Sequence, residues 1–330
     1  MKIIRYATIL LLVFSIVFTA FFGRYKISEG KEIGTPSEYK GIITMWNVDT
    51  FEGGVGSRKQ FLLRVARGFE KENDGVLVMV TDHTTNSVKE NFKNGLYPDI
   101  ISYGNGTCIE NVVELDKSVA IKGGTVGGKN YAAAWCRGGY VLIANPKLTD
   151  NIPDQIDTLL VSQSDYTQPL AALCLEGIVV KEVSVLPPMD AYIKFVEGKT
   201  PYFLGTQRDL NRLERRGVEI ISRPLQNYND LYQYLSVTGK DTTKGVYAER
   251  FVSYLLSESV QKSLTSIGML SCKYSVEYDN EHLSNMQKIV DFSTVSAFTP
   301  SEMLIKMQEL SLRAIKGDEE SKIKIKNMLV

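Results

Sequence analysis

The stretch GIITMWNVDTFEGGVGSR, residues 41–58, is the starting point for interpreting the whole chain. Residues 42–45 form a short apolar run, which predicts a buried strand. Three glycines within residues 53–56 indicate a tight turn with positive φ angles, and Ser57 is a candidate N-cap. The sequence therefore predicts a strand that ends in a polar loop, followed by a helix whose free N–H groups face that loop.

Aromatic and polar side chains gather where this strand should end. They are Trp46, Asn47, Asp49, Phe51 and Glu52. Ligands of open α/β sheets bind at the carboxyl ends of strands, and aromatic faces with hydrogen-bonding neighbours suit sugar rings. These residues are candidate ligand-binding residues, although Asp49 and Glu52 could equally be charges that stabilise the helix N-terminus.

The same pattern repeats along the first hundred residues. Apolar residues recur at helical spacing over 61–69, an apolar strand follows at 76–80, and a polar helix is expected near 85–94. A further strand ends near Tyr103. This β-α-β-α-β order predicts an α/β fold with a parallel, doubly wound sheet, and it places Tyr103 on the same edge as Trp46.

The segment GGTVGGK, residues 123–129, has the spacing of a glycine-rich phosphate loop. Asn130 follows it where such a loop requires serine or threonine, and residues 131–135 show neither a cap nor helical periodicity. We therefore interpret the segment as a turn between strands.

The second half of the chain alternates in a similar way. A strand over 140–144 is expected to cross into a second domain, and GTQRD, residues 205–209, leads into a short helix. We also expect helices near 154–162, 188–197, 281–292 and 301–315, extended segments at 200–204 and 218–221, and helices from 247 to 268.

The N-terminus differs from the rest of the chain, because residues 6–22 are almost wholly apolar between flanking basic residues. The run approaches the length that a bilayer requires, roughly 17 to 25 residues. Its two candidate cleavage sites lack the small residues of a good signal-peptide site. We favour an uncleaved apolar helix over a removed signal, with residues 1–25 as signal or membrane anchor and 26–40 as a tether.

Composition argues against several classes of function. The 330-residue chain has 38 Lys and Arg and 38 Asp and Glu, so no net charge favours nucleic acid. Its two histidines are far apart, which argues against a histidine-built metal site. The four cysteines include no C-x-x-C pair, so a disulfide is allowed but not indicated. We predict no metal and no cofactor.

Several stretches resemble the extracellular solute-binding proteins of bacterial ABC importers, in the broad group that includes the carbohydrate binders. They are ITMWNVDTFEGGVGSR (43–58), YPDIISYGNG (97–106), WCRGGYVLIAN (135–145), and GKTPYFLGTQRDLNRLE (198–214) followed by AERFVSYLLSESVQKSLTSIGML (248–270). The resemblance covers roughly residues 41–307. The chain departs from the family in its short middle region and in having no cysteine before Cys108 that could carry a lipid.

The resemblance implies a two-lobe, periplasmic-binding-protein-like α/β fold of type II. Lobe 1 would comprise residues 41–134 plus 240–285, and lobe 2 would comprise 135–239 plus 286–330. The implied function is extracytoplasmic capture of a small ligand, with a sugar or oligosaccharide favoured, and its delivery to ABC permease subunits. The lobes would close about a hinge around the ligand. The protein would stay on the outer face of the cell membrane, or be secreted if its N-terminus is cleaved.

The resemblance also enlarges the set of candidate ligand-binding residues. It places both tryptophans near the cleft and makes GTQRD a loop that faces the ligand. The added candidates are Tyr103, Trp135, Tyr202, Gln207, Arg208 and Asp209. For Trp46 and Trp135, packing in the core is an equal alternative, and Arg208 and Asp209 could equally form an internal ion pair.

Arg58 is a further candidate because its charge opposes the dipole of the helix that it begins. A nearby carboxylate or an anionic ligand would compensate that charge.

Two other functions remain open from the sequence. An enzyme could use the same fold, but no nucleophile is paired with a base, and His83 and His282 fall outside the stretches above. We therefore expect no enzymatic activity. A binding protein that signals to a membrane sensor is the other alternative, and neighbouring genes for permease subunits would separate it from a transport protein.

We expect the mature protein to retain its N-terminus and to partition with membranes, because residues 6–22 lack a good cleavage site. N-terminal sequencing of the membrane fraction checks this. A mature chain that begins near Phe21 or Arg24 would contradict it.

Overall fold

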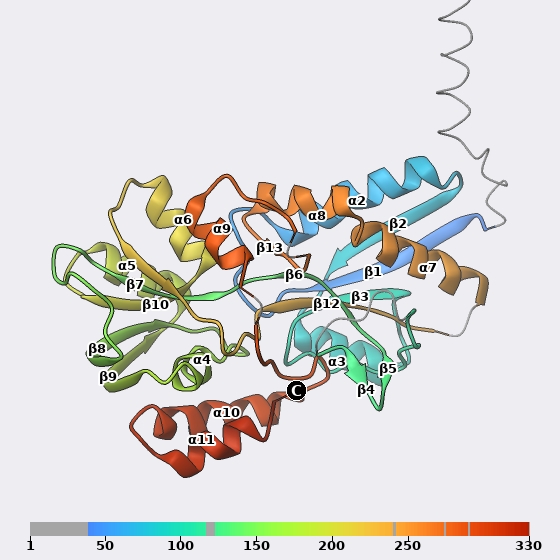
Figure 1. The fold of residues 1–330 in the computed structure, drawn as a ribbon. Coiled ribbons are helices and arrows are strands. Elements are labelled where there is room, and N and C mark those ends of the chain that lie inside the picture. Colours follow the sequence, from blue (N-terminus) through green and yellow to red (C-terminus); the bar gives the residue numbers. More distant parts are fainter. Residues whose placement is uncertain (1–38, 117–122, 240–241, 274, 290, 330) are drawn as a thin grey trace, which may run out of the picture.

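The structure is a computed structural model that describes residues 39–116, 123–239, 242–273, 275–289 and 291–329. Two α/β parts, each built around its own sheet, lie side by side (Figure 1). The predicted apolar helix over 6–22 and nearly all of the predicted tether over 26–40 lie outside the described residues. Within the described ranges, no helix is long and apolar enough to cross a membrane.

A six-stranded mixed sheet forms the first part. From edge to edge its strands are β13 (Leu270–Ser271), β6 (Ala133–Arg137), β12 (Tyr232–Val237), β3 (Ile100–Tyr103), β1 (Gly41–Val48) and β2 (Val76–Asp82). β1 pairs in parallel with β2 and β3, which confirms the parallel arrangement expected for these three strands. β12 runs antiparallel to β3 and β6, and it enters this sheet from the second part of the molecule.

Helices cover both faces of the first sheet (Figure 1). One face carries α2 (Arg58–Glu72), α7 (Thr242–Leu255), α8 (Glu258–Lys262) and the 3-10 helix η2 (Ser263–Ile267), and the other carries α3 (Thr85–Lys93). Because side chains alternate along a strand, Met45 of β1 packs in one core with Phe61 of α2, whereas Val48 packs in another with Phe92 of α3.

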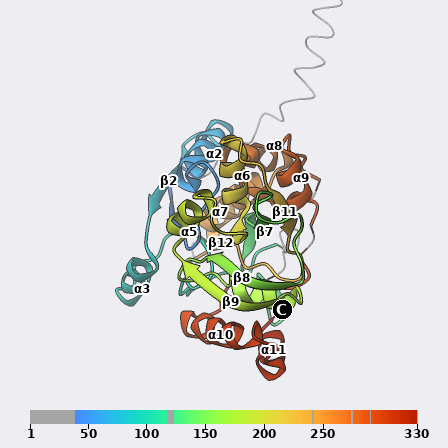
Figure 2. The ribbon, with the colours of Figure 1, turned by 90° about the vertical axis from the view of Figure 1, so that its left-hand side faces the viewer.

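A five-stranded sheet forms the second part. Its order is β11 (Ile221–Pro224), β7 (Tyr140–Ala144), β10 (Tyr202–Thr206), β8 (Gln155–Ser162) and β9 (Val179–Leu186). One face is covered by α5 (Pro188–Val196), α6 (Gln207–Arg215) and α9 (Glu281–Gln287), and the other by α4 (Pro169–Leu175), α10 (Ser301–Ala314) and α11 (Glu319–Lys326). Figure 2 shows α10 and α11 beneath this sheet.

The helix expected over 154–162 was wrong, because this segment is strand β8. Ile156, Leu159 and Leu160 match helical spacing, which suggested a helix. In the structure β8 lies between β9 and β10, so residues 159–162 are buried on both faces and the apolar run has no strand period.

Other expected boundaries differ by a few residues. The extended segments lie at 202–206 and 221–224, and the helix expected over 281–292 ends at Gln287. The GGTVGGK segment contains β4 (Thr125–Val126) and the start of β5 (Lys129–Asn130). The turn between these strands, as expected, is at Gly127 and Gly128, with φ of +57° and +79°.

The chain passes between the two sheets at residues 138–139, as the strand over 140–144 predicted, and again at 225–231. The predicted lobe ranges assigned 135–137 and 232–237 to lobe 2, but these residues belong to β6 and β12 of the first sheet. The lobe ranges remain a prediction. Sheet membership moves the first boundary from residue 134 to residue 137 and the second from residue 239 to residue 231.

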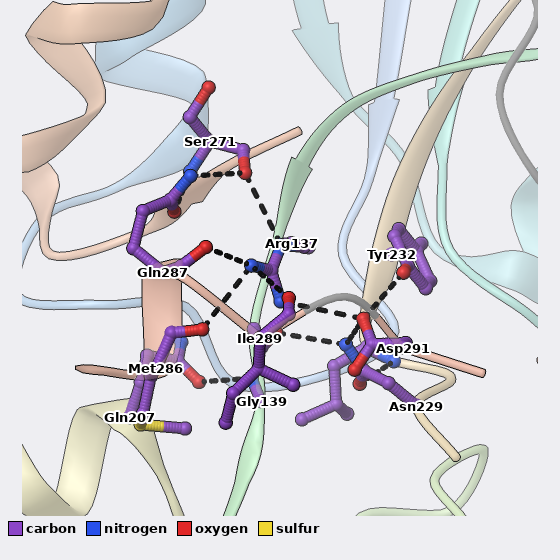
Figure 3. Close-up of polar contacts among 12 residues, drawn as sticks. Arg137, Gly139, Gln207, Asn229, Tyr232, Ser271, Met286, Gln287, Ile289 and Asp291 are labelled. Atoms are coloured by element: carbon purple, nitrogen blue, oxygen red, sulfur yellow. Dashed lines mark hydrogen bonds and ion pairs between the residues drawn. The ribbon is translucent and has the colours of Figure 1, made fainter. Parts of the chain in front are cut away.

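Arg137, the last residue of β6, forms a buried hydrogen-bonding centre beside the first crossing (Figure 3). Its Nε donates to the carbonyl oxygen of Ser271 at 3.2 Å, and its Nη1 lies 3.4 Å from Oδ2 of Asp291. Its Nη2 donates to three further carbonyl oxygens, those of Met286 at 3.3 Å, Gln287 at 2.9 Å and Ile289 at 3.1 Å.

Asp291 extends this network to the second crossing. Its Oδ2 accepts hydrogen bonds from Asn229 Nδ2 at 3.1 Å and from the hydroxyl of Tyr232 at 2.6 Å. Asn229 Nδ2 also donates to the carbonyl oxygen of Gly138 at 3.0 Å. Both crossings and the segment after α9 therefore meet in one buried polar network.

Arg137→Met should destabilise the protein by about 3 to 5 kcal/mol, because it leaves the buried Asp291 carboxylate without its cation. The measurement is the free energy of unfolding in urea. Arg223→Met is the matched control, since Arg223 pairs with Asp154 at the surface, where an ion pair contributes little. Equal stabilities of the two variants would contradict the central role of Arg137.

Candidate functional site

A cavity of about 470 Å³ lies where the two parts of the molecule meet. The first part supplies the loop between β1 and α2, and the second supplies Ser164, which follows β8, and Arg208 in the first turn of α6. The lining residues are Asp49, Thr50, Phe51, Glu52, Gly53, Gly54, Val55, Gly56, Arg58, Ser164 and Arg208. The loop that the sequence singled out therefore forms most of the wall.

Close packing explains why this loop is rich in glycine. None of Gly53, Gly54 and Gly56 has a positive φ angle, so that expectation was wrong. The N–H of Val55 donates to the carbonyl oxygen of Ile267 at 2.8 Å, and a Cβ on Gly54 would lie 1.8 Å from the same oxygen. The loop thus lies directly against the end of η2, where a side chain at position 54 does not fit.

Arg58 is buried in the cavity wall with about 1% of its surface exposed. Ser57 caps α2, as predicted, by accepting from the N–H of Gln60. The Nε of Arg58 lies 2.8 Å from Oδ1 of Asp49, and its Nη2 donates to the carbonyl oxygen of Phe51. Asp49 is therefore a nearby carboxylate that compensates the charge of Arg58, which is one of the two alternatives expected from the sequence.

Asn47 supports this pair from β1 without lining the cavity. Its Nδ2 lies 3.2 Å from Oδ1 of Asp49 and 3.2 Å from Oδ1 of Asp82, and its Oδ1 accepts from the hydroxyl of Ser102 at 3.3 Å. Asn47 therefore helps to orient Asp49.

Arg208 forms an ion pair with Glu52, which connects α6 of the second part to the loop of the first part. The alternative of an internal pair with Asp209 is not what the structure shows. Instead, Asp209 Oδ2 accepts from the N–H of Thr206 at 2.9 Å and from its hydroxyl at 3.3 Å, as a capping box. Burial raises the pKa of Asp209 to about 6.

Neither tryptophan lines the cavity. Trp46 stacks on His83 with ring centroids 4.3 Å apart, on the α3 side of the first sheet. Trp135 is fully buried, stacks on Phe61 at 5.6 Å, and donates from Nε1 to the hydroxyl of Ser102 at 3.2 Å. Both were expected near the cleft, and the structure places both in hydrophobic packing.

Three other candidates also lie outside the cavity lining. Tyr103 is buried, and its hydroxyl lies 3.1 Å from that of Ser236. The hydroxyl of Tyr202 lies 2.8 Å from that of Thr149, at the start of β10. Gln207 is buried and accepts from the N–H of Gly139 at 3.1 Å, which connects α6 to the first crossing. The contacts of all three side chains are therefore structural contacts away from the cavity lining.

Six residues line the cavity without having been predicted as site residues: Thr50, Gly53, Gly54, Val55, Gly56 and Ser164. Thr50 and Val55 could have been included with their neighbours in the loop. Ser164 could not be found while residues 154–162 were interpreted as a helix, because only the end of a strand there places it at the sheet edge. Among the described residues, no group of three or more His, Cys, Asp or Glu side chains could hold a metal ion.

No protein-family model matches the chain, and no curated protein matches its sequence. Solved structures match its fold. Maltodextrin binding protein MalE1 from L. casei is 14% identical with a TM-score of 0.59, covering 88% of this chain and 98% of that one.

Two further structures extend this comparison. The GacH receptor of Streptomyces glaucescens, solved unliganded and with acarbose, is 15% identical with a TM-score of 0.57, covering 88% and 97% of the two chains. Iron-bound HitA from Pseudomonas aeruginosa is 14% identical with a TM-score of 0.56, covering 82% and 99%. At these identities the likeness shows the fold alone. The predicted periplasmic-binding-protein-like α/β fold is confirmed.

Asp209→Asn should change how stability depends on pH. The folded-state pKa of Asp209, about 6, lies above its ordinary value of 3.8. The folded protein therefore binds more protons in this window, and the contribution of Asp209 to stability is lost as the pH rises from about 4 to about 6. The variant lacks this loss, so its stability relative to the parent should rise over that range.

Urea unfolding at several pH values measures this difference. Asp318→Asn is the control, because hydrogen bonding to Ser321 lowers the pKa of Asp318 and its titration lies below this window. Parallel stability curves for the parent and Asp209→Asn would contradict the assignment.

Proposed function

We propose that this protein is an extracytoplasmic solute-binding protein, which captures a small ligand in the 470 Å³ cavity and delivers it to an ABC permease. The observation that carries the proposal is that the cavity has walls from both parts of the molecule. A ligand that contacts both walls binds the closed arrangement more tightly than an open one, and so stabilises closure.

The site residues in this proposal are the candidates that line the cavity: Asp49, Phe51, Glu52, Arg58 and Arg208. Thr50 and Ser164 also line the cavity and are added to this set. Asp209 is proposed to support Arg208 from within α6. Trp46, Asn47, Tyr103, Trp135, Tyr202 and Gln207 are proposed to support the walls, because their contacts are made within the protein.

A sugar or oligosaccharide is the favoured ligand class. Proteins of similar fold were solved with acarbose, with maltotetraose and with maltose. We assign the fold to type II. The support for this assignment is that β12, which follows the second crossing, inserts between β3 and β6 of the first sheet. Permease subunits would be the partners, and residues 6–22 would tether the protein to the outer face of the membrane or serve as a cleaved signal.

A ligand sensor coupled to a membrane protein remains the alternative, because it would need the same cavity. An enzyme is less well supported, since the named neighbours are binding proteins and the cavity pairs each cation with a carboxylate instead of a nucleophile with a base.

Ser164→Trp should abolish ligand binding, because an indole would fill part of the cavity. The ligand is first identified by a thermal-shift screen of sugars, oligosaccharides and anions, and its affinity is measured by calorimetry. Asp165→Trp is the matched control, since this exposed neighbour does not line the cavity and should keep the parent affinity.

Unchanged affinity in Ser164→Trp would place the ligand elsewhere and contradict the proposal. The ligand should also be recovered chemically unchanged after long incubation. Turnover that is lost in a Glu52→Gln variant would favour an enzyme instead.

A further inference from the structure

The cavity wall contains a cation with an unused donor. The Nη2 of Arg58 donates to the carbonyl oxygen of Phe51, and its Nε forms an ion pair with Asp49 at 2.8 Å without a hydrogen bond. Its Nη1 has no hydrogen-bond partner among the described residues. A buried donor without an acceptor is unfavourable, and more so when it is charged. An acceptor from a bound ligand would remove this cost.

The N-terminus of α2 supplies further donors at the same place. This helix has 15 residues, and the loop that precedes it lines the cavity. Ser57 satisfies the N–H of Gln60, whereas the N–H groups of Arg58 and Lys59 have no acceptor within the helix. Unpaired N–H groups and the positive end of a helix dipole favour an anion.

Arg208 approaches from the opposite wall, where Glu52 pairs with it. Glu52 lies in the loop between β1 and α2, and about a third of its side chain is exposed. Its carboxylate therefore occupies the position at Arg208 that an anionic group of a ligand could take.

The lining offers no open aromatic face for a neutral sugar ring. Phe51 is the one aromatic residue in the lining of this cavity among the described residues, and it is buried beneath Arg58, whose Cζ lies 4.2 Å from the ring centroid. Recognition here therefore depends on charge and hydrogen bonding.

We propose that the ligand carries a carboxylate or phosphate group, which binds between Arg58, the N-terminus of α2 and Arg208, and which displaces Glu52 from Arg208. This inference rests on the proposed function and specifies its ligand class. Asp49 and the displaced Glu52 require donors on the same ligand, which hydroxyl groups supply. The class is thus a small acidic, hydroxylated molecule, such as a sugar acid or a sugar phosphate.

The test uses sulfate and phosphate as probes, with sodium chloride at the same ionic strength as reference, and measures the melting temperature as a function of anion concentration. Both probes should raise the melting temperature of the parent more than chloride does. Glu52→Gln should lower the apparent Kd for sulfate on the order of tenfold, because it frees Arg208, and Arg208→Gln should raise it by a similar factor.

Lys59→Gln is the matched control for the loss of one positive charge. Lys59 also lies in the first turn of α2, but it pairs with Asp82 at 3.0 Å and does not line the cavity. Its affinity for sulfate should equal that of the parent.

Equal effects of sulfate and chloride, in both the parent and Glu52→Gln, would overturn the anion site. An effect of Lys59→Gln as large as that of Arg208→Gln would overturn it too, because the anions would then be acting on the overall charge. A neutral sugar whose binding is blocked by Ser164→Trp, but is unaffected by Glu52→Gln and Arg208→Gln, would overturn the anionic ligand class and leave the proposed function intact.

Discussion

The buried ion pair between Arg137 and Asp291 is the interaction on which the relation between the two sheets depends. Transferring both charges from water costs several kcal/mol per ion. That cost is offset because Arg137 donates to four carbonyl oxygens, while Asp291 accepts from Asn229 and Tyr232. The partners come from both crossings and from the segment after α9. A change in the relative position of the two sheets would therefore have to keep these buried hydrogen bonds or break them at a cost.

A second buried carboxyl group, that of Asp230, belongs to the second crossing itself. Asp230 accepts from the hydroxyl of Tyr140 at 2.6 Å and from the N–H of Gln168 at 2.9 Å, and its own carbonyl oxygen accepts from Asn105 at 2.9 Å. Burial raises the pKa of Asp230 to about 7. The two carboxyl groups differ in one respect, since Asp291 has a cation within ion-pair distance and Asp230 is held by neutral donors. Polar contacts thus fix both crossings, next to an apolar cluster that extends from Met45 and Phe61 of the first part to Leu142 and Leu204 of the second.

Local patterns predicted the elements that depend on local interactions. The strand over 41–48, the Ser57 cap and the GGTVGGK turn were predicted correctly because an apolar run, a capping residue and two glycines with positive φ determine them directly. β8 was missed because a strand buried on both faces has no period of two. The sequence also could not predict the pairing of Glu52 with Arg208. These residues are far apart along the chain and meet only because the chain crosses between the two sheets.

The same reasoning explains why aromatic residues misled the choice of site residues. An aromatic side chain at a strand end can face a ligand or a neighbouring helix, and its direction depends on the strand's alternation and on what packs there. Trp46 points toward α3 and stacks on His83, whereas the polar residues after β1 continue into the cavity. Large apolar rings are stabilised most by burial in the cores. What remains at the junction is a set of charges that are largely paired with each other. A ligand therefore gains affinity by replacing the pair of Glu52 with Arg208 and by accepting from Nη1 of Arg58, and selection at this site depends on matching both signs of charge.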